Sequence, residues 1–176
     1  MFERGFNDMG IQELVNRAGV PKGSFYNHFD SKEAFAVTAV EHYTEQGLQM
    51  VADRLHEGEG TPLERLSSFY HNWADAFQKG DQNGCLVGNL SQEVSNQRPH
   101  IQQVLASSYE RSLEEITKSI KNAQDANELS PEAATEEIAF AVHNGWHGAL
   151  IHAKAIQSSV PLMQFCNSVL PKLLAV

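Results

Sequence analysis

Cysteine is scarce in this sequence, and the two that occur, Cys85 and Cys166, lie far apart. They fit neither a disulfide framework nor the paired spacing of a cysteine zinc site. No apolar run approaches the roughly 18 residues that cross a bilayer, and the first residues lack the basic-then-apolar order of a signal peptide. These absences predict a soluble, cytoplasmic protein with reduced thiols.

Basic residues are also few: 13 Lys and Arg stand against 22 Asp and Glu, and the net charge is −9. That balance argues against an extended nucleic-acid surface. The acidity is uneven, however, because residues 1–40 hold four basic and five acidic residues and residues 41–176 hold nine and seventeen. Within residues 17–32, Arg17, Lys22 and Lys32 face Asp30 alone. This segment can therefore form a weakly basic, DNA-facing patch.

Strand-like alternation, repeats and low-complexity tracts are lacking, whereas apolar residues recur at three- and four-residue spacing. The pattern predicts an all-α chain of about eight helices. The predicted ranges are 11–18, about 21–28, 30–55, 61–77, about 85–94, 101–120, about 130–156 and 159–174. A length of 176 residues suits one domain, or a small head on a larger body.

Local capping signals mark several of these ends. Gly19 ends the first helix, because glycine adopts positive φ without a side-chain clash. Asp30 followed by Glu33 reads as a capping box, and so does Thr61 followed by Glu64 with a proline between them. Ser130-Pro131 is the expected start of the helix that reaches about Ile156.

A helix, a glycine turn and a short second helix have the geometry of a helix-turn-helix. Phe25 and Phe29 are four residues apart and share one face, which we expect to be buried. Lys22, Ser24, Tyr26 and Asn27 then lie mostly on the exposed sides, and Gly23 would let the helix backbone approach a DNA strand. Lys32, in the first turn of the next helix, would be explained by an anionic partner such as a phosphate.

These residues resemble the DNA-binding head of TetR-family transcriptional regulators. The elements that carry the resemblance are Gly5-Phe6, the helix 11–18, Gly19-Val20, residues 22–29 and Ser31-Lys32-Glu33. By this resemblance Tyr26 and Lys32 hold phosphates, Lys22, Ser24 and Asn27 lie nearest base edges, and His28 lies beside the backbone. The expected DNA-binding residues are Lys22, Gly23, Ser24, Tyr26, Asn27, His28 and Lys32.

The sequence departs from the family pattern at three places. The family carries a full helix before Gly5-Phe6, and this chain holds only residues 1–4 of it. Met9-Gly10 stands where the family usually has Thr or Ser, so Asp8 or Asn7 is the expected cap. Val20 precedes Pro21 where a hydroxyl cap is common. The missing first helix motivates the alternative of a regulator that has lost DNA binding.

Residues 84–94, Gly-Cys-Leu-Val-Gly-Asn-Leu-Ser-Gln-Glu-Val, are similar to a branch of the family with a Gly-Cys-Leu turn entering a short helix. The resemblance implies that Cys85 senses electrophiles, and a thiol at a helix N-terminus has a lowered pKa. The alternative is a small buried side chain. An apolar effector pocket is expected from Trp73, Phe77, Cys85, Asn89, Tyr109 and Trp146.

His143 and His147 are four residues apart and share a helical face. With Cys85 they suggest an alternative function, a thiol- or metal-dependent helical enzyme. The general-base glutamate of a zinc protease is absent, however. Small residues around them (Ala141, Gly145, Gly148, Ala149) and the apolar last helix instead indicate a dimer interface built from the last two helices.

The expected architecture is a helix-turn-helix DNA-binding domain in residues 1–34, its first helix mostly absent, and a helical effector-binding and dimerisation domain in residues 35–176. The expected function is a homodimeric transcriptional regulator, most simply a repressor that a small apolar ligand or electrophile releases from double-stranded operator DNA. No catalytic residue, metal or cofactor is expected.

Overall fold

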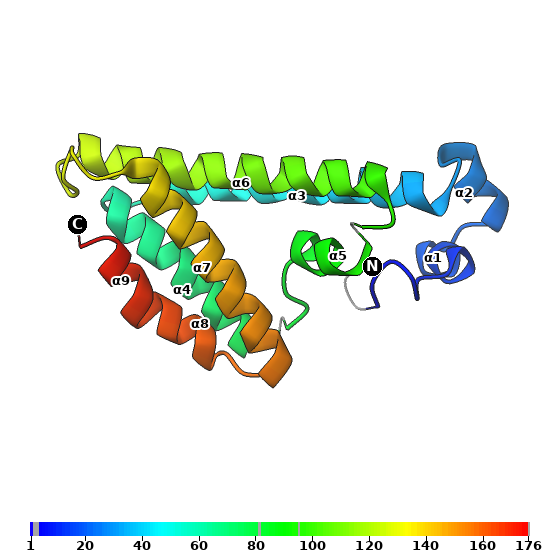
Figure 1. The fold of residues 1–176 in the computed structure, drawn as a ribbon. Helices are drawn as coiled ribbons and strands as arrows, with labels where there is room; N and C mark the ends of the chain where they lie inside the picture. The colour runs from blue at the N-terminus through cyan, green and yellow to red at the C-terminus, as the bar shows by residue number, and fades with distance from the viewer. Residues whose placement is uncertain (2–3, 81, 95, 176) are drawn as a thin grey trace. The chain divides into compact units, whose positions relative to one another are not determined.

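The computed structural model describes residues 1, 4–80, 82–94 and 96–175. Within these ranges all regular structure is helical and no strand occurs, which confirms the all-α prediction (Figure 1). No helix in the described part of the chain is both long enough and apolar enough to cross a bilayer. Parts of two predicted segments, the N-terminal residues 1–4 and the loop 79–84, lie outside the described residues.

The helices follow the predicted order closely. They are α1 (Ile11–Ala18), α2 (Lys22–His28), α3 (Lys32–His56), α4 (Pro62–Gln78), α5 (Leu86–Val94), α6 (Pro99–Asp125), α7 (Thr135–Ile156), α8 (Val160–Gln164) and α9 (Leu170–Leu173). A π-helical turn, Phe165–Val169, joins α8 to α9, so the predicted last helix is one helical run with a wider turn inside it.

The chain forms two compact units, one of residues 1–46 and 85–109 and the other of residues 47–84 and 110–176. Helices α3 and α6 contribute residues to both units. The first unit therefore contains α5 in addition to the predicted helix-turn-helix. The functional division at residues 34 and 35 stays a prediction.

The core of the first unit is formed by apolar residues of α3, α5 and α6 with Phe6. Its buried members are Phe6, Ala36, Val40, Leu86, Val87, Leu90, Val94, Ile101 and Leu105. At its edge the hydroxyls of Thr44 and Ser108 share a buried hydrogen bond of 2.7 Å. Each hydroxyl also lies within hydrogen-bond distance of the carbonyl four residues earlier, Val40 for Thr44 and Val104 for Ser108, so neither donor is left unsatisfied.

The core of the second unit combines aliphatic side chains with a cluster of aromatic rings. The Tyr70 ring lies 4.9 Å from Trp146 and 5.4 Å from Phe165, measured between centroids. Gly145 allows this packing, because a Cβ there would lie 2.9 Å from the Phe165 ring. Helix α7 therefore approaches Phe165 at a position where a side chain would clash.

Two capping predictions are confirmed. Gly19 adopts φ 67°, the left-handed conformation expected at the end of α1. Thr61 and Glu64 form the predicted capping box at the start of α4, with Thr61 accepting from the Glu64 N–H and Glu64 accepting from the Thr61 N–H. Both motifs are local, which explains why sequence alone reveals them.

Two other capping residues and one helix start were predicted wrongly. Ser31, not Asp30, caps α3, since its Oγ accepts from the Ala34 N–H at 3.0 Å. Neither Asp8 nor Asn7 caps α1; Gly10 is the cap residue and offers no side chain. Helix α7 begins at Thr135 instead of Ser130-Pro131. There, the Gln124 amide donates to the carbonyls of Ser130 and Ala133 and so holds a turn before the helix.

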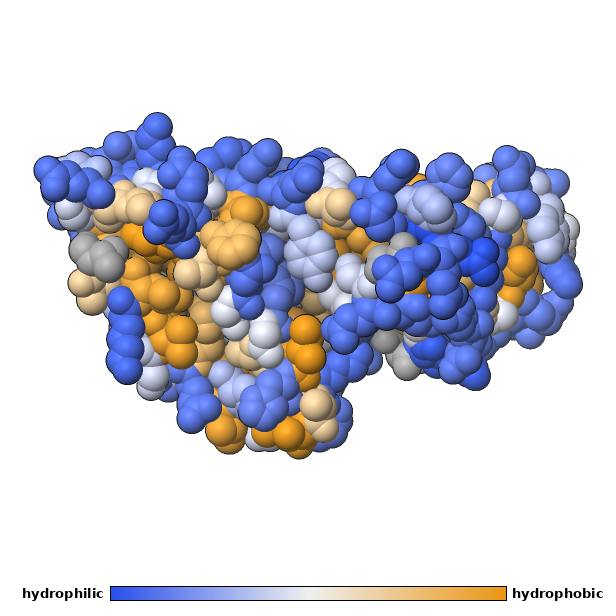
Figure 2. Space-filling model, viewed as in Figure 1, coloured by the Kyte–Doolittle hydropathy of each residue, from blue (hydrophilic) through white to orange (hydrophobic). Residues whose placement is uncertain are grey.

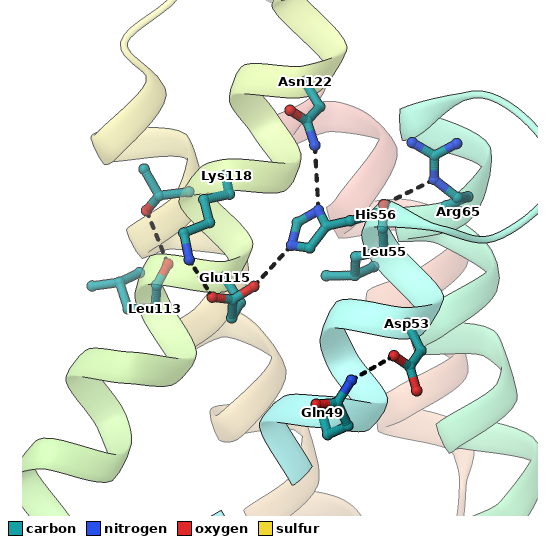
Figure 3. A network of polar contacts seen from close by, with 10 residues as sticks. Gln49, Asp53, Leu55, His56, Arg65, Leu113, Glu115, Lys118 and Asn122 are labelled. Atoms are coloured by element: carbon teal, nitrogen blue, oxygen red, sulfur yellow. Dashed lines mark hydrogen bonds and ion pairs between the residues drawn. The ribbon is translucent and has the colours of Figure 1, made fainter. Parts of the chain in front are cut away.

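A polar network joins the end of α3 to α6 within the second unit (Figure 3). The His56 Nε2–H donates to Glu115 at 2.8 Å, and Asn122 donates to His56 Nδ1 at 3.3 Å. Lys118 also donates to Glu115. Burial raises the pKa of the Glu115 carboxyl, but hydrogen bonds and charge from Lys118 and His56 outweigh burial, and the pKa is lowered overall.

Because the folded-state pKa of Glu115 is lowered, its carboxylate stabilises the fold above the unfolded-state value, about 4.3, and this contribution disappears as pH falls through the folded-state value. We therefore expect Glu115→Gln to lose about 1 to 2 kcal/mol of unfolding free energy at pH 7. The difference from the wild type should shrink below about pH 4. Urea unfolding at a series of pH values measures this, and a difference that is independent of pH would contradict it.

Candidate DNA interface and effector site

The turn between α1 and α2 fixes the direction of the second helix. Gly19 in its left-handed conformation donates to the carbonyls of Asn16 and Val15, and the Val20 N–H also donates to Val15 at 3.0 Å. Pro21 is the residue before α2, and its carbonyl accepts from the Ser24 N–H at 3.0 Å. The backbone groups at both ends of the turn are thus hydrogen-bonded without help from a side chain.

Three phenylalanine rings anchor α2 to the start of α3. Phe25 is buried and lies 5.4 Å from Phe29 and 5.8 Å from Phe35, and Phe29 lies 5.1 Å from Phe35. These are the distances of favourable tilted and edge-on ring pairs. The face of α2 that carries Phe25 is therefore directed inward, as predicted.

The opposite side of α2 is exposed, as a groove-reading helix requires. Tyr26 is 53% exposed. Lys22, Gly23, Asn27 and His28 are also exposed, and Ser24 is half-buried. No atom lies within 4 Å of where a Gly23 Cβ would stand, so the backbone there is open to approach. The structure brings six of the seven predicted DNA-binding residues together on one short helix.

Lys32, the seventh, lies at the start of α3 and already has partners. Its Nζ donates to the Asn7 carbonyl at 3.1 Å and lies 4.5 Å from the centroid of the Phe6 ring. An ammonium group carries three N–H donors, so one hydrogen bond leaves others for a phosphate. The side chain is thus held in position and still able to bind.

Cys85, directly before α5, and Tyr109, on α6, lie close together in the first unit. A Cβ on Gly88 would lie 3.6 Å from the Tyr109 hydroxyl and 3.8 Å from the Cys85 Cβ. Burial raises the pKa of the Tyr109 hydroxyl and nearby Cys85 raises it further, against a hydrogen bond with Ser91 that lowers it. Ser91 was missed by the sequence reasoning, because a lone serine in an amphipathic helix gives no signal.

The other four predicted pocket residues do not all belong to the first unit. Asn89 is half-buried on α5, where its N–H donates to the Cys85 carbonyl. Trp73, Phe77 and Trp146 belong to the second unit, and Phe77 and Trp146 are buried in its core. A single pocket lined by all six residues therefore stays a prediction.

Comparison with known protein families decides between a regulator and an enzyme. Residues 1–39 match the family described as bacterial regulatory proteins, tetR family, and residues 62–169 match the tetracyclin repressor-like C-terminal domain.

The chain belongs to the TetR family of transcriptional regulators. It is accordingly a DNA-binding regulator and not an enzyme.

Several relatives share nearly the whole length of this TetR-family chain. It is 30% identical to the HTH-type transcriptional repressor DhaR of Mycobacterium sp. strain GP1, covering 98% of this chain and 85% of DhaR. It is 32% identical to the HTH-type transcriptional repressor NemR of Escherichia coli K12, covering 91% and 81%. A crystal structure of reduced E. coli NemR superposes with a TM-score of 0.88 at 28% identity, over 99% of this chain and 91% of that one.

The histidine pair of this TetR-family chain lies in α7. The rings of His143 and His147 are 4.6 Å apart. Burial lowers the pKa of both, that of His147 to about 4 with a contribution from His143. Among the described residues no group of three or more His, Cys, Asp or Glu side chains is arranged to hold a metal ion. The pair thus packs in the second unit, and burial favours the neutral form of both rings.

A substitution at Gly88 tests whether reagents reach the Cys85 thiol from the side of Tyr109. We expect Gly88→Ala to slow alkylation of Cys85 by iodoacetamide several-fold, because the new methyl would contact both the Cys85 Cβ and the Tyr109 hydroxyl and would crowd the thiol. The same change should raise the unfolding free energy by about 0.5 to 1 kcal/mol, since glycine is unfavourable inside a helix. Thiol mass spectrometry and urea unfolding measure the two effects.

Gly47→Ala is the matched control, because Gly47 lies inside α3 with no atom within 4 Å of its Cβ position. It should stabilise the fold similarly and leave alkylation unchanged. Equal alkylation rates in Gly88→Ala and the wild type would show that reagents reach Cys85 by another route.

Proposed function

We propose that this chain is a repressor that binds operator DNA through the exposed face of α2 and leaves it when an apolar ligand or electrophile reaches the residues around Cys85. The observation that carries the proposal is the burial of Phe25, which turns Lys22, Tyr26 and Asn27 outward. Repression is supported by the names of DhaR and NemR, both called transcriptional repressors. The protein would act in the cytoplasm, where its operator is.

In this proposal the DNA-facing residues have two roles. Tyr26 and Lys32 hold phosphates and fix the register of α2 on the duplex. Lys22, Ser24 and Asn27 contact base edges in the major groove and carry the sequence information. Gly23 and His28 lie close to the DNA backbone.

A homodimer would place two copies of α2 on successive turns of the duplex, about 34 Å apart. The dimer surface we propose is the exposed face of α7 and the last helices. Figure 2 shows hydrophobic side chains gathered over α7, α8 and α9. The exposed apolar side chains on these segments are Phe140, Ile151, Ile156, Val160 and Val169. An apolar surface of this kind marks an interaction site more often than a solvated face.

The chemistry proposed for Cys85 is addition to an electron-poor alkene. The thiolate sulfur forms a bond to the β-carbon as the alkene π bond breaks, and the electron pair moves to the α-carbon, which takes a proton. No oxidant is required. Support comes from the half-buried position of Cys85 at the start of α5.

The DNA-binding face is tested by two variants with different signatures. Lys22→Ala should weaken operator binding about tenfold or more and reduce the preference for operator over unrelated DNA, as expected for a base-edge contact. Tyr26→Phe removes one hydroxyl and should weaken both kinds of binding by the same factor, as expected for a phosphate contact. Gel retardation with DNA from beside the protein's own gene measures both.

Lys121→Ala is the control for lost charge, because Lys121 is also an exposed lysine but lies on α6 in the second unit. It should bind the operator like the wild type. If Lys22→Ala and Lys121→Ala behave alike, α2 does not read the DNA. A wild-type chain that retards no DNA would instead indicate a regulator that has lost its operator.

The effector site is tested with N-ethylmaleimide as the electrophile. We expect the reagent to release the wild-type chain from its operator and to act at least about tenfold more slowly on Cys85→Ser. Cys166→Ser should respond like the wild type, because Cys166 is buried and burial raises the pKa of its thiol to about 11. Unchanged release of Cys85→Ser would exclude thiol sensing at this position.

A further inference from the structure

A carboxylate at the end of α5 is bound by two backbone N–H groups near the N-terminus. Glu93 Oε2 accepts from the Phe6 N–H at 2.8 Å, and Glu93 Oε1 accepts from the Asn7 N–H at 2.7 Å. All three residues lie in the first compact unit. Two short hydrogen bonds to a charged acceptor form a strong and directional contact. We name this contact, Glu93 with the N–H groups of Phe6 and Asn7, the Glu93 clasp.

Gly5 makes room for the Glu93 clasp. It adopts φ 74°, and a Cβ at this position would lie 2.4 Å from Glu93 Oε2. Only glycine combines this backbone conformation with that clearance. The chain before α1 is thus shaped around the carboxylate.

Asn7 links the Glu93 clasp to Lys32. Asn7 gives its N–H to Glu93, and its carbonyl accepts from Lys32 Nζ at 3.1 Å. Phe6 donates its backbone N–H to Glu93, and its ring centroid lies 4.5 Å from the Lys32 ammonium. Both contacts that position the ammonium group therefore come from residues that Glu93 holds.

We propose that Glu93 is a positioning residue for DNA binding, which fixes residues 6 and 7 so that Lys32 is held ready for a phosphate. The inference rests on the proposed function, in which Lys32 contacts the DNA backbone. Glu93 itself would not touch DNA, because its carboxylate is occupied by the two N–H groups and would repel phosphates. The helix that ends with the clasp begins directly after Cys85.

The direction of the change in operator affinity distinguishes a positioning role of Glu93 from a purely electrostatic effect of its charge. Removing a negative charge near DNA should tighten binding, whereas loss of the Glu93 clasp should weaken it. Glu93→Gln keeps the shape of the side chain but offers one acceptor oxygen, and its amide N–H group would face a second N–H donor. We expect operator binding about tenfold weaker than in the wild type, comparable to the loss of a charged hydrogen bond.

Asp8→Asn is the matched control, since Asp8 is an exposed carboxylate in the same segment. It should bind the operator as tightly as the wild type or more tightly. Glu93→Asp, which keeps the charge but draws the carboxylate back by one methylene, should fall between the wild type and Glu93→Gln. Thermal unfolding of each variant shows whether the fold survives, and the intermediate behaviour of Glu93→Asp still tests the proposal if Glu93→Gln does not fold.

Salt dependence distinguishes positioning from a general structural role. If each subunit of a dimer loses its Lys32 phosphate contact, the slope of log K against log salt should become shallower by about 1.8, or roughly 0.9 per contact. A variant that is only less stable would lower the active fraction and leave the slope unchanged. Fluorescence anisotropy with labelled operator at several salt concentrations gives both affinity and slope.

A double-mutant cycle with Lys32→Gln completes the test. If Glu93 acts through Lys32, the double variant should bind no more weakly than Lys32→Gln alone. Additive losses with an unchanged slope would overturn the proposal, as would a Glu93→Gln chain that binds like Asp8→Asn. If Lys32→Gln weakens binding and Glu93→Gln does not, only this inference fails. If the wild-type chain shows no salt-dependent operator binding, the proposed function fails as well.

Discussion

The packing of Phe25 against Phe29 and Phe35 determines which side of α2 meets solvent. Phe25 and Phe29 are four residues apart, and Phe35 lies on α3. The burial of Phe25 leaves the hydroxyl, amide and ammonium groups on the other side of α2 exposed. Burying one such ring contributes about 1.5 to 3 kcal/mol, more than any single surface contact nearby. Rotating α2 would expose this apolar surface, so the orientation of the recognition face follows from the hydrophobic effect and not from DNA.

Helix α5 carries the proposed effector cysteine at one end and the Glu93 clasp at the other, both within the first unit. Cys85 lies directly before its first residue, close to the Tyr109 hydroxyl of α6 and to Gly88. At its end, Glu93 accepts hydrogen bonds from the backbone N–H groups of residues 6 and 7. Its buried face, with Leu86, Leu90 and Val94 among its residues, joins the same core as Phe6. The segment that family resemblance associates with effectors is thus packed together with the segment that precedes the DNA-binding helices.

Sequence reasoning succeeded where the signal is local and failed where it is not. The all-α class, the Gly19 turn and the Thr61 capping box follow from neighbouring residues, and all are confirmed. The start of α7 was wrong because the Gln124 side chain, from the preceding helix, binds the carbonyls of the turn. The Glu93 clasp was missed since its partners are 86 and 87 residues away, and a glutamate near a helix end resembles any solvated one. Lys32 was predicted to bind a phosphate from its place in the first turn of α3, but its contacts with Asn7 and Phe6 are visible only in the structure.

The most direct test of the account is a crystal structure of this chain bound to its operator. We predict that Phe25 stays buried against Phe29 and Phe35, that the Tyr26 hydroxyl and the Lys32 ammonium lie within hydrogen-bond distance of phosphates, and that Lys22 or Asn27 reaches a base edge. A complex in which α2 faces away from the duplex, or in which the phenylalanine rings contact DNA, would contradict it.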